Sequence, residues 1–426
     1  MVSPRQRGHP RCNRMSGGSV ADLIKTLGDL QLLQPAQLKE LTRTVPANSP
    51  ERRAVAKMLL QRGWLTAYQI HQLGQGRGEE LALGRYVLLE QLGEGSMGRV
   101  FKARHRDLNR LVAVKILREE RWAKPAAVRR FYREIQAAAQ LCHPNIVLVY
   151  DADQVKKKIF FAMEYIDGID LHQLVKQSGP LPVALACEYI RQAAWGLQHA
   201  FEHGLVHRDI KPANLRVTLA PPSPAGSQTE QVVKILDLGS AYWTWSAEND
   251  LSDTDVTEEE MILGTVDYIA PEQAKDSRNV DIRTDMYSLG CTFYYLLTGR
   301  PPFPEGSAME KLLKHQTENP VPLGFLRPDV PREISAVVDK LLCKRAADRY
   351  QTPAELAEAL SSRMPPDISQ SPDSWADIVT PPATDPHWAG QPRGNVWKKE
   401  RLWLAAVLAL LFVAGLLILV VFPPDP

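Results

Sequence analysis

The alternation of apolar and polar residues changes character several times along the chain. Between about residues 19 and 75, apolar residues recur at the spacing of amphipathic helices. Helix-start signals precede these runs: capping-box pairs Ser19 with Asp22 and Thr66 with Gln69, and the segment Ser49-Pro50-Glu51. We therefore expect a small helical appendage over residues 19–78, preceded by a disordered N-terminus over residues 1–18.

From Tyr86 onward the pattern changes to short runs rich in Val, Leu and Phe, which predict strands. The expected strands are residues 86–92, 98–105, 111–117, 146–151 and 159–164, with one helix over residues 126–140. Beyond Gly168 the pattern is mostly helical. The expected helices are residues 171–176, 183–203, 285–297, 309–315, 334–343 and 353–360. This order predicts an α+β, bilobal fold with a β-rich N-terminal lobe and a helical C-terminal lobe.

The C-terminal part of the chain has a different composition. Residues 361–400 are rich in Pro, Ser and Asp and are expected to form a linker. Residues 402–422 are an uncharged apolar run, long enough as a helix to span a bilayer core. Cations precede this run and none follows it, so the positive-inside rule places the preceding chain in the cytoplasm. We expect a single-pass protein of the inner (cytoplasmic) membrane with a short extracytoplasmic tail, residues 423–426.

Composition narrows the classes of function. The 426 residues are 44% hydrophobic and 23% charged, as in an ordinary globular protein. A formal net charge of +2 gives no global basic field, so we expect no nucleic-acid partner. Five dispersed cysteines argue against a disulfide framework or a zinc site.

Residues 207–214, His-Arg-Asp-Ile-Lys-Pro-Ala-Asn, bring together three chemically useful side chains. Asp209 is a candidate to accept a hydroxyl proton, Lys211 to neutralise a phosphate and Asn214 to hold a divalent metal. Phosphoryl transfer depends on this combination of positioning, charge neutralisation and a metal clamp.

Other segments supply the remaining requirements of phosphoryl transfer. The sequence Gly93-Glu94-Gly95-Ser96-Met97-Gly98 lies between two expected strands, where glycines bring backbone N–H groups close to phosphates. Lys115 ends the run Val-Ala-Val-Lys, and a lysine flanked by apolar residues needs a charged partner. The segment Arg133-Glu134-Ile135 lies on the next expected helix. The sequence Leu236-Asp237-Leu238-Gly239 follows further along the chain.

These motifs, in this order, resemble those of eukaryotic-type (Hanks-type) serine/threonine protein kinases over residues 86–360. The arrangement of appendage, kinase domain and one membrane span resembles bacterial transmembrane members. The resemblance implies transfer of the ATP γ-phosphate to Ser/Thr hydroxyls of proteins, with ATP and Mg²⁺ (or Mn²⁺) as cofactors. The alternative is an ATP-binding pseudokinase scaffold. A pseudokinase usually lacks the lysine, the catalytic aspartate or the metal-binding aspartate, whereas this chain has all three, as Lys115, Asp209 and Asp237.

The resemblance also assigns residues to roles. The implied catalytic residues are Asp209, Lys211, Lys115 and Glu134, with Glu134 as the charged partner of Lys115. The implied metal ligands are Asn214 and Asp237. The implied nucleotide-binding residues are Leu92, Gly93, Glu94, Gly95, Ser96, Gly98, Val100, Ala113, Lys115, Glu164 and Ile166. The implied structural residues are Arg208, Thr265, Glu272, Asp285 and Arg349, with Asp285 bracing the catalytic loop and Glu272 paired with Arg349.

Several positions concern regulation or depart from the family pattern. Arg208 implies control by a phosphate on the activation segment, where Thr254 and Thr257 are the candidate autophosphorylation sites. Arg216 occupies a position that is usually apolar beneath the adenine. Ala138 and Leu238 are smaller or more aliphatic than usual between the lobes, so we expect the helix that carries Glu134 to need support, with homodimerisation as the hypothesis.

Overall fold

The computed structural model describes residues 19–45, 52–95, 98–119, 125–219, 231–237, 266–275 and 280–363. The chain divides into two compact units, Met1–Pro381 and Pro382–Pro426, and all described residues belong to the first. Among them, no helix combines the length and the apolar character needed to cross a membrane. The apolar run 402–422 lies outside the described residues.

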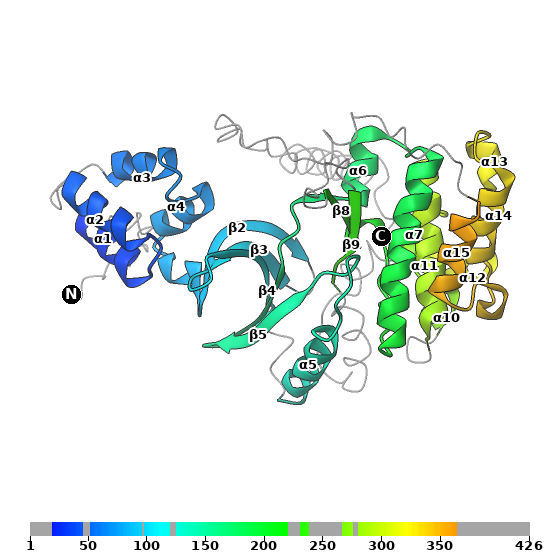
Figure 1. The fold of residues 1–426 in the computed structure, drawn as a ribbon, viewed down its shortest axis with the longest axis horizontal. Coiled ribbons are helices and arrows are strands. Elements are labelled where there is room, and N and C mark those ends of the chain that lie inside the picture. The colour runs from blue at the N-terminus through cyan, green and yellow to red at the C-terminus, as the bar shows by residue number, and fades with distance from the viewer. Residues whose placement is uncertain are drawn as a thin grey trace, which may run out of the picture. The chain divides into compact units, whose positions relative to one another are not determined.

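Four helices form the N-terminal appendage (Figure 1). They are α1 (Val20–Asp29), α2 (Pro35–Thr44), α3 (Arg52–Gln61) and α4 (Ala67–Gly74). The two expected capping boxes are present, because Ser19 caps α1 together with Asp22, and Thr66 caps α4 together with Gln69. The leucine and valine stripes of these helices meet in one buried cluster, which also includes Leu81 and Val87 just beyond the appendage.

The N-terminal lobe is built on a six-stranded antiparallel sheet with the order β1-β2-β3-β4-β6-β5. Its strands are β1 (Ala82–Leu83), β2 (Tyr86–Gly95), β3 (Gly98–His105), β4 (Arg110–Leu117), β5 (Val149–Val155) and β6 (Lys158–Glu164). Helix α5 (Pro125–Ala138) follows β4. Phe131 and Ile135 on α5 share a buried cluster with Ala113, Phe161 and Met163 of the sheet, which holds α5 against one face of the lobe.

The C-terminal lobe is mainly helical. Its longer helices are α6 (Leu171–Ser178), α7 (Val183–Glu202), α11 (Ile282–Thr298), α12 (Ala308–Thr317), α14 (Arg332–Leu341) and α15 (Pro353–Ser361), and α10 (Pro271–Lys275) and α13 (Leu323–Leu326) are short. A three-stranded sheet, β7 (Gly168–Asp170), β8 (Leu215–Leu219) and β9 (Gln231–Ile235), lies beside α7 (Figure 1). Described residues therefore form the β-rich and helical lobes expected of a bilobal fold.

Two element boundaries differ from the sequence expectations. The strand expected over residues 146–151 is β5, Val149–Val155, because Ile146 and Val147 instead pair with Ile235 across the lobes. β5 extends into polar residues because it is an edge strand of the sheet. The helix expected to begin at Asp285 begins at Ile282, since Asp281 caps it by accepting a hydrogen bond from the Arg283 N–H.

Candidate active site

The loop between α7 and β8 brings the three candidate side chains of residues 207–214 together. Lys211 Nζ lies 2.8 Å from Asp209 Oδ2. Asn214 Nδ2 donates to the Asp209 backbone oxygen at 2.8 Å and to Asp209 Oδ2 at 3.0 Å. Asp209 is thus held from two sides by groups that leave it partly exposed, as a group that must meet a substrate requires.

Asp285, completely buried on α11, fixes the backbone of this loop. Its two carboxylate oxygens accept hydrogen bonds from the His207 N–H at 2.7 Å and the Arg208 N–H at 2.6 Å. Burial raises the pKa of Asp285, and the two N–H donors oppose this shift. Arg208 has a φ of 65°, a conformation that is costly for a non-glycine residue and that these bonds help to maintain.

His207 links the loop to the segment after β9 that carries Asp237. Its ring Nε2 lies 2.8 Å from the Leu236 backbone oxygen, and the Leu236 N–H donates to the Asn214 backbone oxygen at 2.8 Å. Asp237, with a φ of 57°, therefore follows a segment that is tied directly to the candidate catalytic loop.

Lys115 on β4 reaches across to Asp237, with Nζ 3.0 Å from Oδ1. The enclosed position of Asp237 disfavours its charged form, but the nearby Lys115 ammonium outweighs this and lowers the pKa of Asp237. A carboxylate and an ammonium from different lobes thus meet beside Asp209 and Asn214. The side chain of Glu134, the partner expected for Lys115, lies outside the described side chains, although its backbone lies in α5.

The glycine-rich segment forms the end of the β2–β3 hairpin, where Gly93 pairs with Val100 and Gly95 with Gly98. Gly98 has a φ of 155°, and a Cβ at this position would lie 2.1 Å from the Ile116 carbonyl oxygen. Only glycine therefore allows the tip of the hairpin to approach β4 this closely. Leu92 and Glu94 are exposed on the same hairpin.

The candidate adenine-binding residues lie where β4 and β6 meet the link to the C-terminal lobe. Ala113 pairs with Met163, and Ile166 is buried two residues beyond the end of β6. Glu164 is held by Lys234, whose Nζ lies 2.9 Å from Glu164 Oε2. Arg216 lies on β8 and donates to the Gly168 carbonyl oxygen through Nε at 3.0 Å and through its terminal nitrogen at 2.6 Å.

Glu272 and Arg349 meet in the C-terminal lobe. The guanidinium of Arg349, fully buried, donates to both carboxylate oxygens of Glu272 at 2.7 and 2.8 Å. Partial burial of Glu272 opposes ionisation, but its bonds to Arg349 outweigh this and lower the pKa of Glu272. Thr284 Oγ1 also donates to Glu272, at 2.9 Å.

Some expected site residues lie outside the described residues. These are Ser96, Leu238, Thr254, Thr257 and Thr265. Residues 221–230, between β8 and β9, also lie outside them.

The donor set fits a hard divalent cation. Asp237 offers a carboxylate, and Asn214 offers its amide oxygen because its amide nitrogen is engaged by Asp209. Mg²⁺ is commonly held by one or two such protein oxygens, with substrate phosphates and water completing its shell. Across the described ranges, no group of three or more His, Cys, Asp or Glu residues is arranged to hold a metal ion.

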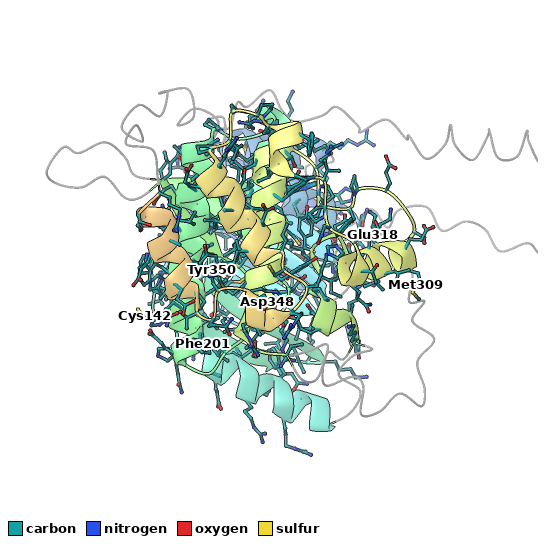
Figure 2. All side chains as sticks on the ribbon, turned by 90° about the vertical axis from the view of Figure 1, so that its right-hand side faces the viewer. Cys142, Phe201, Met309, Glu318, Asp348 and Tyr350 are labelled. Carbon is teal, nitrogen blue, oxygen red and sulfur yellow. The ribbon has the colours of Figure 1, made fainter. Side chains whose placement is uncertain are left out.

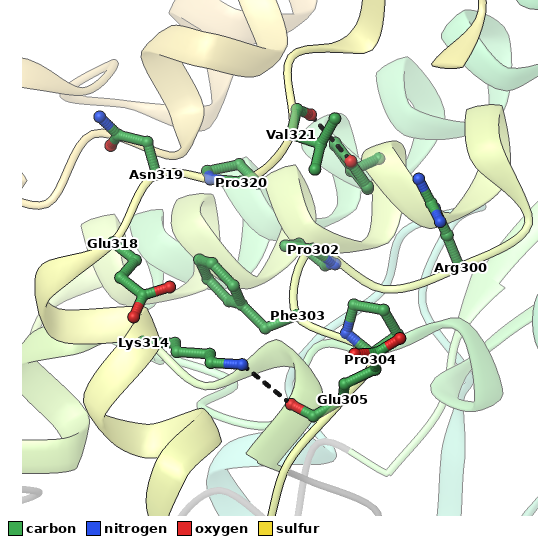
Figure 3. A pocket seen from close by; sticks show the side chains of 11 residues that line it. Arg300, Pro302, Phe303, Pro304, Glu305, Lys314, Glu318, Asn319, Pro320 and Val321 are labelled. Carbon is green, nitrogen blue, oxygen red and sulfur yellow. Dashed lines mark hydrogen bonds between the residues drawn. The ribbon is translucent and has the colours of Figure 1, made fainter. Parts of the chain in front are cut away.

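A separate pocket of about 260 Å³ lies beside α11 and α12 (Figure 3). It is lined by Tyr294, Arg300, Pro302, Phe303, Pro304, Glu305, Lys314, Glu318, Asn319, Pro320 and Val321. None of these is an expected site residue. Figure 2 labels Met309 in the first turn of α12 and Glu318 just after its last residue, and both are exposed.

Comparison with known proteins decides the family. The model of the protein kinase domain matches residues 86–361 of this chain. The chain belongs to the protein kinase family. The matched range contains strands β2 to β6 and the helical lobe, whereas the appendage and β1 precede it.

The relatives include bacterial serine/threonine-protein kinases. Serine/threonine-protein kinase PknB of Mycolicibacterium smegmatis is 37% identical over 347 residues, which cover 76% of this chain and 53% of that protein. PknB of Mycobacterium tuberculosis is 38% identical over 276 residues, covering 64% of this chain and 42% of that protein. The chain thus spans about half the length of these curated relatives.

A solved structure agrees with the fold. The crystal structure of the Mycobacterium tuberculosis PknI kinase domain has a TM-score of 0.50 to this chain at 28% sequence identity. The match covers 66% of this chain and 97% of the PknI domain. The bilobal kinase architecture is therefore shared with an experimentally determined relative.

Sequence reasoning missed several residues that hold the site together. His207 connects the catalytic loop to the Asp237 segment, and its place in His-Arg-Asp was a usable signal. Gln273 Nε2 donates to the Arg208 carbonyl oxygen at 2.8 Å, and Lys234 holds Glu164. Neither Gln273 nor Lys234 carries a local sequence signal, because each acts on a residue more than sixty positions away.

Proposed function

We propose that the protein is a serine/threonine protein kinase that transfers the ATP γ-phosphate to Ser or Thr hydroxyls of proteins. The observation that carries this proposal is the meeting of Asp209, Lys211 and Asn214 with the Lys115–Asp237 pair. The names of the bacterial relatives support the Ser/Thr branch.

The side chains divide the work of phosphoryl transfer. Asp209 orients the substrate hydroxyl and accepts its proton, while Lys211, held 2.8 Å from Asp209, stabilises the negative charge of the moving phosphoryl group. Lys115 grips the nucleotide phosphates, and the glycines at positions 93, 95 and 98 let the hairpin cover them. Hydrogen bonds from the loop backbone to Asp285 keep Asp209 in place before substrate arrives.

Asn214 and Asp237 are the residues that would hold the metal, Mg²⁺ or Mn²⁺. When bound with ATP, the metal neutralises charge on the bridging and transferred phosphate oxygens. Separation of Lys115 from Asp237 would then free the Asp237 carboxylate for the metal and the Lys115 ammonium for the phosphates.

The proposal is tested by phosphate transfer from radiolabelled ATP to a generic protein substrate. We expect Asp209→Asn to lower kcat by about 10²- to 10⁴-fold, the range typical of a lost general base. Asp153→Asn, the same change at an exposed position on β5, is the matched control and should leave the rate unchanged. Equal signal from the wild type and Asp209→Asn would leave the pseudokinase scaffold as the reading.

We also propose autophosphorylation at Thr254 or Thr257. Arg208, directly before Asp209, would pair with the phosphate on either threonine. Mass spectrometry after incubation with ATP and Mg²⁺ should find one of these threonines modified in the wild type and neither in Asp209→Asn. Absence of phosphate from both threonines in an active preparation would rule out this form of regulation.

A membrane location is proposed from residues 402–422, whose uncharged apolar run is preceded by Lys398, Lys399 and Arg401. The kinase domain would then lie in the cytoplasm, tethered to the inner membrane. The full chain should remain in the membrane fraction after carbonate extraction, and Leu411→Arg combined with Leu417→Arg should release it. The matched control is Leu411→Ile with Leu417→Ile, and release of the wild type itself would contradict the tether.

Homodimerisation is proposed as the support for helix α5. Ala138 on α5 is small and buried, so little side-chain volume is available there to lock the helix against its neighbours. Specific activity should therefore rise with protein concentration. A specific activity that stays constant on dilution would exclude this role for a dimer.

A further inference from the structure

The outer edge of strand β2 is only partly covered by another strand. β1 is two residues long and pairs with Tyr86 and Val87 alone. In the described part of the sheet, β2 has no other strand on this side, so its backbone beyond Val87 needs different partners. Helix α4 of the appendage lies beside β2 at this point (Figure 1).

Two side chains of the α4 N-terminus bond the free edge of β2. Gln69, only 1% exposed, donates through Nε2 to the Leu88 carbonyl oxygen at 2.9 Å. The Thr66 hydroxyl donates to the Leu89 carbonyl oxygen. Leu89 is the residue that the β2–β3 register skips, as in a β-bulge, so its carbonyl lies where the strand ladder is interrupted.

The same two residues also close the capping box of α4. Thr66 Oγ1 accepts from the Gln69 N–H at 3.2 Å, and Gln69 Oε1 accepts from the Thr66 N–H at 3.0 Å. Every polar atom of the pair thus has a defined partner in α4 or β2. Such a connected, partly buried network favours a single geometry for the two elements.

Packing fixes the appendage on both sides of this network. The ring of Tyr68 lies 5.8 Å from that of Phe101 on β3, and Val87 is part of the buried core of the appendage. The Arg106 guanidinium, just beyond β3, donates to the Leu30 carbonyl oxygen at 2.6 Å. The appendage is therefore anchored to the near end of the β2–β3 hairpin at several points.

The far end of this hairpin carries the glycines expected to cover ATP. Leu89 and Gly93 are four residues apart on β2, and a second register shift lies between Gln91 and Gly93. Bulges bend and twist a strand, so the direction of the hairpin beyond Leu89 depends on how the bulge is held. Thr66 donates a hydrogen bond to Leu89 at this bulge, Gln69 donates one to the preceding Leu88, and Leu89 also packs against the core of the appendage.

We propose that Thr66 and Gln69 are positioning residues for nucleotide binding, because they anchor the bulge that sets the direction of the glycine-rich hairpin. This gives the appendage a role in the kinase site itself, and it rests on the proposed function for the identity of the nucleotide. Loss of either hydrogen bond makes the hairpin more mobile. Part of the free energy of nucleotide binding is then spent on ordering the hairpin, which weakens the affinity for the nucleotide.

The test uses the full chain with Thr66→Val and Gln69→Leu, which keep side-chain size and remove the bonds to β2. From the usual strength of one hydrogen bond, we expect the dissociation constant for ATP to rise roughly three- to tenfold. The KM for ATP should rise by a similar factor while kcat changes less than about twofold. Hydrogen exchange of residues 90–95 should accelerate in the protein without nucleotide.

Three controls separate positioning from general loss of stability. Thr66→Ser keeps the hydroxyl and should behave as the wild type. Ser19→Ala removes the capping box of α1, and Gln37→Leu removes that of α2, without any bond to β2. If these two variants weaken ATP binding as much as Gln69→Leu, or if Gln69→Leu leaves both ATP binding and hairpin exchange unchanged, the proposal is overturned.

The outcome is distinguishable from failure of the proposed function. A wild type that binds ATP but transfers no phosphate would remove the kinase activity and leave the positioning role to be decided by the dissociation constants. A wild type that binds no ATP would overturn the positioning role together with the kinase proposal.

Discussion

The carboxylate of Asp285 helps to hold the candidate catalytic loop in a backbone conformation that is costly for Arg208. Its oxygens receive the N–H groups of His207 and Arg208, and Arg208 has a positive φ. Sequence comparison with the family pointed to position 285 as a brace. The two specific donors, and the buried environment that makes their bonds costly to lose, appear only in the folded chain.

Asp285→Asn should therefore loosen the loop. An amide can accept one of the two hydrogen bonds but turns its own NH₂ toward the second N–H, leaving that donor unsatisfied. We expect a loss of about 1–3 kcal/mol in the free energy of unfolding, measured by urea denaturation, and a fall in kcat of about tenfold or more. Asp170→Asn is the control, since Asn caps a helix as well as Asp does at the start of α6. Equal stability of the two variants would contradict the bracing role.

At the scale of elements, α12 is held against α11 by a buried histidine. His315 is completely buried, and its Nδ1 lies 2.9 Å from the Tyr287 hydroxyl. The ring of Phe303 contacts it edge-on, and the Lys344 ammonium bonds the same hydroxyl at 3.3 Å. The sequence predicted a helix here but gave no sign that its histidine would be internal.

This burial makes stability depend on pH. Burial and the charge of Lys344 lower the pKa of His315 from 6.5 to about 3. In the unfolded chain this histidine is protonated near pH 6.5, whereas in the folded chain it stays neutral until about pH 3. The free energy of unfolding therefore decreases as the pH falls from about 6.5 toward 3. His315 contributes up to about 1.4 kcal/mol per pH unit to this loss.

His315→Asn should flatten that dependence. Urea unfolding at pH 7, 6 and 5 measures it, and this range lies above the lowered pKa values of Glu272 and Asp281. The variant is less stable than the wild type at pH 7, but its stability should change less between pH 7 and 5. His71→Asn, a change at an exposed histidine of α4, should keep the wild-type slope. Parallel slopes for all three proteins would show that His315 is not the group responsible.

Arg349 joins elements that lie far apart in the sequence. Besides Glu272, its guanidinium donates to the carbonyl oxygens of Cys343, Lys344 and Arg283. Lysine keeps the charge but has neither the planar fork nor enough donors for these partners. Arg349→Lys should lower the free energy of unfolding by about 2–4 kcal/mol, near the cost of breaking a buried ion pair. Arg345→Lys, at an exposed position, is the control and should have little effect in the same urea titration.

At the scale of the whole molecule, the appendage and the N-terminal lobe share buried surface. Leu81 and Val87 belong to the core of the appendage, and Tyr68 of the appendage packs on the outer cluster of the lobe. A separate tethered module would instead keep its own closed core and a solvated linker. The appendage is therefore expected to be part of the same folding unit as the lobe.

Cooperative unfolding tests this expectation. Peptides from α1 and α2 and peptides from β2–β4 should become unprotected against hydrogen exchange at the same urea concentration, because the shared core cannot be lost from one without exposing the other. Exchange of the appendage at a midpoint lower by about 1 M urea or more would show that it unfolds independently.

Particular residues show how far the sequence could predict. Gly93 to Gly98, Lys115, Asp209, Asn214 and Asp237 could be named as candidate site residues because kinase motifs have fixed residue types at local spacings. The capping boxes at Ser19 and Thr66 were found because a helix start is a local event. The bonds from Gln273 and Lys234 to the site, and the strand bounds of β5, could not be predicted, since each depends on a partner distant in sequence.

The sequence by itself determined the order of the two lobes, which follows from periodicity, and the resemblance to the kinase family, which motifs of a few residues carry. The same motifs supplied the candidate side chains for the chemistry. Tertiary structure decided what those side chains touch. It placed Lys115 on Asp237, the Asp285 carboxylate beneath the catalytic loop and Thr66 with Gln69 on the edge of β2. Contacts of this kind depend on close packing between distant segments, which no local pattern records.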